Sequence, residues 1–96
     1  MNIGVLLFHN FETLDVYGPV EIFGRLVDLY SIRFYSLNGG QIENKHGVSV
    51  CTNKLDDINE KLEIFLIPGG IGTRNEIGNK PLIDKIREVA MISKYV

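Results

Sequence analysis

Apolar runs alternate along this chain with segments of helical periodicity, and this alternation predicts its secondary structure. Residues 3–8 are almost continuously apolar, which is typical of a strand covered on both faces of a parallel sheet. Residues 62–68 carry the strongest strand pattern, since Ile64 to Ile67 are all apolar. Strands are expected at residues 3–8, 31–37, 41–45, 48–52 and 62–68, with a hairpin-type turn at Asn38-Gly39-Gly40.

Two longer segments carry apolar residues at helical spacing. In the first, Gly18-Pro19 interrupts the pattern, and proline suits the first turn of a helix better than its interior. We therefore expect a turn that carries Asp15, followed by a helix from about Pro19 to Asp28. The clearest helix covers residues 80–94, because Pro81 stands in its first turn. Short helical turns are expected at residues 55–61 and 73–78, and Tyr95-Val96 is expected to begin a further strand.

The succession of strand, helix and strand predicts the fold class. It implies a mostly parallel sheet with helices on both faces, so we expect an α/β, flavodoxin-like three-layer α/β/α sandwich. Ligands bind outside the carboxyl ends of the strands in such sheets. The ends of the strands at 3–8 and 62–68 are expected to lie close together, which places Asp15 and the loop from Gly69 to Thr73 in one crevice.

Composition and charge narrow the class of protein. A length of 96 residues allows one small domain, and 45% hydrophobic with 23% charged residues is typical of a globular fold. The net charge of −2 and the scattered basic residues argue against a nucleic acid partner. No stretch approaches the roughly 20 apolar residues of a bilayer span, and no signal peptide pattern is present. We expect no membrane partner and a cytoplasmic location.

Sequence patterns for metals and cofactors are missing. The single cysteine, Cys51, allows no internal disulfide, and the spacing of a four-ligand metal site is absent. No Gly-x-Gly-x-x-Gly follows the first strand, which argues against a dinucleotide. We expect no cofactor and no metal. Cys51 is expected to be a small buried residue of a strand, and His9 to lie at the surface or at the mouth of the crevice.

Candidate chemistry gathers at Asp15 and at the run Pro68-Gly69-Gly70-Ile71-Gly72. A glycine loop lets a substrate approach backbone N–H groups that can stabilise an oxyanion, and the alternative is a tight turn that needs positive φ. Asp15 either exchanges a proton with a nucleophile or caps a helix. Arg74 follows the loop and either holds an anionic group of a substrate or is an exposed surface residue.

Two motifs in this order carry a family resemblance: Phe11-Glu12-x-Leu14-Asp15-x-x-Gly18-Pro19, then Ile67-Pro68-Gly69-Gly70-x-Gly72. The chain resembles the ThiJ/PfpI superfamily, within the class I glutamine amidotransferase-like fold, and Leu-Asp before x-x-Gly-Pro resembles its isocyanide hydratase branch. The resemblance implies that the Asp15 carboxyl group bonds to a catalytic cysteine and that the Gly70 N–H helps form an oxyanion hole. It also places the cysteine a few residues beyond Val96. The interpretation of the glycine run as a donor loop places Gly69, Ile71, Gly72 and Arg74 near the substrate.

On this resemblance, residues 1–96 are the N-terminal part of a single domain, truncated before the strand-to-helix elbow that carries the nucleophile. The complete protein is expected to be an isocyanide hydratase-like or amidase-like enzyme acting on a small carbon–nitrogen substrate. The alternative is a non-catalytic ligand-sensing or interaction domain, either a sensor like that of AraC-type regulators or a truncated vestige. An exposed sheet edge and apolar surface predict a homodimer or another association through that edge.

Overall fold

Strand β1 (Asn2–Leu6) lies inside a five-stranded sheet whose order is β3-β4-β2-β1-β5. The computed structural model describes residues 2–25, 30–44, 46–58, 61–69 and 78–96. Ile3 pairs in parallel with Ile32 of β2 on one side and with Ile64 of β5 on the other. The remaining strands extend the sheet beyond β2. The strands are β2 (Ser31–Ser36), β3 (Gly40–Glu43), β4 (Ser49–Lys54) and β5 (Ile64–Leu66).

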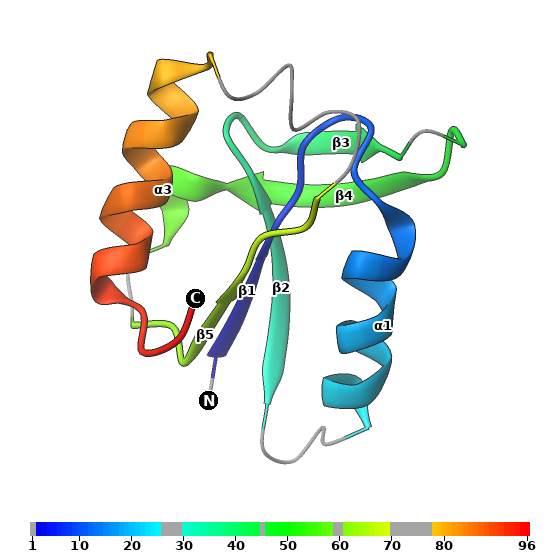
Figure 1. The fold of residues 1–96 in the computed structure, drawn as a ribbon, viewed down its shortest axis with the longest axis horizontal. Helices are drawn as coiled ribbons and strands as arrows, with labels where there is room; N and C mark the ends of the chain where they lie inside the picture. Colours follow the sequence, from blue (N-terminus) through cyan, green and yellow to red (C-terminus); the bar gives the residue numbers. More distant parts are fainter. Residues whose placement is uncertain (1, 26–29, 45, 59–60, 70–77) are drawn as a thin grey trace.

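Among the residues that the structure describes, an α-helix lies on each face of the sheet (Figure 1). Side chains alternate between the two faces of a strand, so Ile3, Val5 and Leu7 form one buried cluster and Leu6 belongs to another. Helix α1 (Thr13–Gly24) packs on the first cluster through its buried Val16. Helix α3 (Lys80–Ile92) packs on the second cluster, together with the short 3₁₀ helix η1 (Leu55–Asp57). The α/β, flavodoxin-like sandwich predicted from the sequence is confirmed.

Helix α1 differs from its prediction. It begins at Thr13, six residues before Pro19, so Asp15 lies in its first turn and the proline lies inside it. Tertiary packing gives a reason for the earlier start, because the helix that begins at Thr13 carries Val16, which is fully buried in the cluster on β1. Pro19 inside the helix removes one backbone hydrogen bond and adds a local clash.

Helix α3 agrees closely with its prediction. Asn79 is its N-cap, with the side-chain Oδ1 accepting from the N–H of Leu82 at 3.3 Å, and Pro81 stands in the first turn. Its inner residues Leu82 and Val89 are buried in the core. The helix ends at Ile92, two residues before the predicted end.

The turn at Asn38-Gly39-Gly40 does not join paired strands. Gly39 and Gly40 have φ of 72° and 80°, as a turn requires, but β3 pairs antiparallel with β4 and not with β2. The hairpin turn therefore lies between β3 and β4. Cys51 was expected to be buried, and this is wrong, since it lies exposed on β4.

A further strand begins beside β5, as predicted. Tyr95 forms a parallel bridge with Ile64, its N–H donates to the Glu63 carbonyl at 2.9 Å, and its carbonyl accepts from the N–H of Phe65 at 2.8 Å. Within the described ranges, no helix is both long enough and apolar enough to cross a bilayer.

Candidate functional site

Asp15 and Gly69 meet at the carboxyl edge of the sheet. The Gly69 N–H donates to Oδ2 of Asp15 at 3.0 Å, and the Glu12 N–H donates to the Gly69 carbonyl at 2.9 Å. These two bonds fasten the segment after β5 to the first turn of α1. Asp15 and Gly69 are 54 positions apart in sequence, and the structure brings them together as the sequence predicted.

Gly69 suits this contact because it has no side chain. A Cβ built at position 69 would lie 3.3 Å from Asp15 Oδ2, which is tighter than ordinary van der Waals contact. A larger residue would push the carboxyl group away from the backbone N–H that it accepts from. The glycine therefore allows the close approach that the hydrogen bond needs.

The pair lies where ligands bind in this class of sheet. Strand β1 has β2 as its neighbour on one side and β5 on the other. The strands that follow β1 in sequence are added first on the β2 side, and β5 is then added on the opposite side of β1. The order of the strands therefore switches between β1 and β5. The crevice outside the carboxyl ends of the strands at such a point is the usual ligand site of open α/β sheets. Asp15 is exposed there and its carboxyl group is accessible to a ligand.

The β3–β4 hairpin also reaches this edge, which the sequence analysis did not predict. Buried Asn44, at 3% exposure, donates from Nδ2 to Thr13 Oγ1 at 2.7 Å. Its Oδ1 accepts the N–H groups of His46 and Val48, both at 2.9 Å. An asparagine three residues before a glycine is a turn signal, which is visible in the sequence. Its contact with Thr13, 31 positions away, is not.

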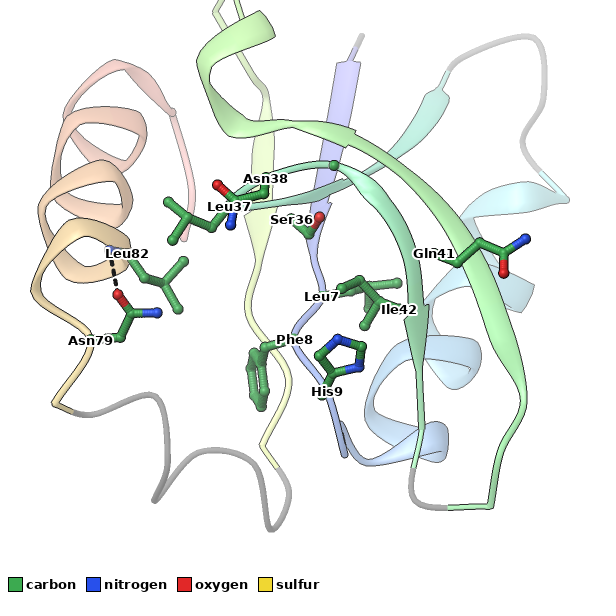
Figure 2. A pocket seen from close by; sticks show the side chains of 11 residues that line it. Leu7, Phe8, His9, Ser36, Leu37, Asn38, Gln41, Ile42, Asn79 and Leu82 are labelled. Carbon is green, nitrogen blue, oxygen red and sulfur yellow. Dashed lines mark hydrogen bonds between the residues drawn. The ribbon is translucent and has the colours of Figure 1, made fainter.

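A hollow lies at the carboxyl ends of β1 and β2 (Figure 2). It has a volume of about 200 Å³, and Phe8, His9 and Ile42 are among its lining residues. His9 is exposed, and its Nδ1 accepts from the N–H of Glu43 at 3.4 Å. The sequence allowed His9 either a surface position or a place at the crevice mouth, and it lies at the surface while lining this neighbouring hollow.

The remaining predicted site residues lie outside the described residues. These are Gly70, Ile71, Gly72 and Arg74. Cys51 is separated from the Asp15 edge, since β4 carries it and β2 lies between β4 and β1. Among the residues that the structure describes, no three His, Cys, Asp or Glu side chains are grouped to hold a metal ion. The catalytic roles of Asp15 and Gly70 and the substrate contacts of Gly69, Ile71, Gly72 and Arg74 stay predictions.

Solved structures share this fold at low sequence identity. DJ-1beta from Drosophila melanogaster is 21% identical, with a TM-score of 0.73 over 91% of this chain and 48% of its own. An alanine mutant of a DJ-1 superfamily protein from Salmonella typhimurium is 19% identical, with a TM-score of 0.76 over 94% of this chain and 50% of its own. An AraC family transcriptional regulator from Pseudomonas putida is 17% identical, with a TM-score of 0.67 over 96% of this chain and 61% of its own.

The chain spans about half the length of the first two of these structures. No curated protein matches it. The sequence profile of the DJ-1/PfpI family matches residues 1–96, which is the whole chain. The motifs around Asp15 and Gly69 and the order of the sheet agree with that match, and the chain therefore belongs to the DJ-1/PfpI family.

Proposed function

We propose that this chain provides the carboxyl group and the backbone donors of a cysteine-dependent site that hydrates or hydrolyses a small carbon–nitrogen compound. The observation that carries the proposal is the hydrogen bond from the Gly69 N–H to Asp15 Oδ2. It brings an accessible carboxyl group to the start of a glycine loop at the edge where ligands bind. A carboxyl group beside backbone N–H donors suits a reaction in which a proton moves while negative charge develops on the substrate.

The strand that begins at Tyr95 supports a nucleophile at the same edge. It runs parallel to β5, and Tyr95 pairs with Ile64, five positions before Gly69. We expect a longer chain that continues this direction beside β5 to run toward the carboxyl edge where Gly69 lies. Neighbouring strands lie about 4.8 Å apart, so a thiol at the end of such a strand is expected near Gly69. This direction agrees with the cysteine that the family resemblance implies.

Each residue then has a definite role in the proposed reaction. Asp15 takes a proton from the thiol or from water and passes that proton to the substrate. The Gly70 N–H stabilises the developing negative charge, while Gly69, Ile71 and Gly72 border the substrate. Arg74 holds an anionic group where the substrate has one. An isocyanide is the substrate class that the Leu14-Asp15 motif favours, and its hydration adds one water molecule to give an N-substituted formamide.

A turnover assay tests this function in protein whose chain continues the strand begun at Tyr95. Formation of the formamide from a small aryl isocyanide is followed by absorbance, and Asp15→Asn is compared with Asp84→Asn. Asp84 is a matched control because it is also exposed and lies near the start of a helix. Loss of a general acid or base predicts a fall in kcat/KM of about 100-fold or more for Asp15→Asn and little change for Asp84→Asn. Equal activity of the two variants contradicts the role of Asp15.

Ligand sensing without catalysis is the competing function. The fold likeness to the AraC family regulator supports it, since nearly the whole chain is matched by that protein. A sensor binds the same small molecules saturably and does not convert them. Saturable binding that is abolished by Asp15→Asn, without formation of product, would favour sensing over catalysis.

A further inference from the structure

We propose that Asn44 and Thr13 act as positioning residues for Asp15. The Asn44–Thr13 link is the hydrogen bond from Asn44 Nδ2 to Thr13 Oγ1, at 2.7 Å. Thr13 is the first residue of α1, and Asp15 lies two positions further in the same turn. The link therefore joins the β3–β4 hairpin to the turn that presents the carboxyl group. Its importance for catalysis rests on the proposed function, but its effect on the position of Asp15 does not.

The orientation of the Asn44 side chain is fixed by its surroundings. Two backbone N–H groups, those of His46 and Val48, point at the same side-chain atom from 2.9 Å. Only the carbonyl oxygen can accept both, so this atom is Oδ1 and the other is the NH₂ group. Asn44 must then donate to Thr13, and Thr13 Oγ1 must accept. The donor and acceptor of the link cannot exchange while the hairpin turn keeps its bonds.

Other contacts hold the hairpin against the segment before α1. The Asn10 N–H donates to the Glu43 carbonyl at 2.9 Å, and Phe11 forms a parallel bridge with Asn44. Asn10 has a φ of 65°, a left-handed conformation that asparagine tolerates better than most residues. Backbone contacts at residues 10 and 11 thus hold the turn before α1 against the hairpin. The Asn44–Thr13 link adds a side-chain contact between the hairpin and the first residue of the helix.

Asp15 needs such support because it is exposed. Its side chain bonds to the Gly69 N–H, and no surrounding core restricts it. The bond keeps its length of 3.0 Å only while the first turn of α1 keeps its rotation and height relative to the sheet. Burial of Asn44, at 3% exposure, partly shields the link from water and so strengthens it. Removing Thr13 Oγ1 is therefore expected to weaken the hydrogen bond between the Gly69 N–H and Asp15 Oδ2, in which Thr13 takes no part.

Amide hydrogen exchange at Gly69 tests the proposal. In Thr13→Val the link is lost and the hairpin turn is kept, because valine has the shape of threonine without the acceptor. We expect the Gly69 amide to exchange about five times faster in Thr13→Val than in the natural protein, relative to the Val5 amide of the core, which corresponds to one weakened hydrogen bond. Thr13→Ser keeps the acceptor and is expected to restore slow exchange.

Thr52→Val is the matched control. Thr52 is also a half-buried threonine, in the same hairpin, and its hydroxyl group bonds to Ser36 Oγ and to the Gly40 carbonyl, both at 2.6 Å. Thr52→Val is expected to weaken the contacts of β4 with Ser36 and Gly40, away from the Asn44–Thr13 link, and to leave the relative exchange of Gly69 unchanged. The proposal is overturned if Thr13→Val leaves Gly69 unchanged, or if Thr52→Val accelerates it equally. This readout needs no turnover, so a failure of the proposed function is seen separately in the assay with Asp15→Asn.

Discussion

The residues at the carboxyl edge differ in how far their roles can be predicted from the sequence. Asp15 and Gly69 stand out because each belongs to a motif with fixed spacing, and the structure joins them by a hydrogen bond of 3.0 Å. Asn44 belongs to no such motif. Its role depends on the antiparallel pairing of β3 with β4 and on the place of that hairpin beside α1. Short-range patterns predict turns and caps, whereas a contact across 31 positions follows from the assembled fold.

Gly4 gives a prediction at the scale of one residue. It lies in β1, where an added Cβ would meet Leu62 Cδ1 at 2.6 Å and Tyr35 Cε2 at 3.4 Å. Leu62 and Tyr35 are both buried, so neither can move aside freely. Gly4→Ala is expected to lower the free energy of unfolding by about 1–3 kcal/mol, measured by chemical denaturation.

Gly24 provides the matched control for this substitution. No atom lies within 4 Å of a Cβ at Gly24, in the last turn of α1. Gly24→Ala is expected to raise the free energy of unfolding slightly, by about 0.5 kcal/mol, because alanine favours helix more than glycine does. A Gly4→Ala variant as stable as the natural protein would show that the packing around β1 is looser than described.

At the scale of elements, helix α1 shows where pattern and structure separate. The proline signal favours a helix that begins at Pro19, whereas burial of Val16 against the sheet favours one that begins at Thr13. Tertiary packing determines where the helix begins. Asp15 therefore lies in the first turn of the helix and not in a turn before it. Helix α3 shows no such conflict, since its cap, its proline and its apolar face all indicate the same boundaries.

The contact between α3 and η1 gives a prediction for pH. Hydrogen bonds to Asp56, and secondly to Glu88, raise the pKa of the Lys85 ammonium group above its ordinary value. A raised pKa in the folded state means that this stabilisation is complete below the unfolded value of about 10.4 and is lost as the pH rises through the folded value. Thermal unfolding from pH 8 to pH 11.5 is therefore expected to show a steeper loss of Tm in the natural protein than in Lys85→Met.

Lys61→Met serves as the control for general charge, because Lys61 is an exposed lysine. It is expected to follow the pH dependence of the natural protein. Identical slopes for all three proteins would mean that the Lys85 contacts contribute nothing to stability. The effect is expected to be small, since Lys85 and its partners lie near the surface and water screens them.

At the scale of the whole molecule, the edge beyond β5 predicts association. Tyr95 pairs with Ile64 on one side, and Tyr95 and Val96 are 58% and 70% exposed. Exposed apolar residues beside an open strand edge favour pairing with another chain. We expect the 96-residue chain to self-associate with rising concentration in light scattering, and Tyr95→Lys to reduce this.

Leu14→Lys is the control that distinguishes association through this edge from association through other apolar surface. Leu14 is 76% exposed, and it lies on α1, away from the edge strand. Leu14→Lys is expected to leave association unchanged. A chain that stays monomeric throughout, or one that Leu14→Lys dissociates and Tyr95→Lys does not, contradicts association through the edge. The family resemblance predicts an unpaired edge beside the strand of residues 62–68, and the structure adds the parallel bridge of Tyr95 with Ile64 of β5.

The contact between Asp15 and the segment after β5 is tested most directly by the chemical shift of the Gly69 amide proton, measured in isotope-labelled protein at constant pH. We predict an upfield shift in Asp15→Asn and little change in Asp84→Asn, because the Gly69 N–H donates to Asp15 Oδ2. A Gly69 resonance that Asp15→Asn leaves in place would show that Asp15 and the segment after β5 do not form one site.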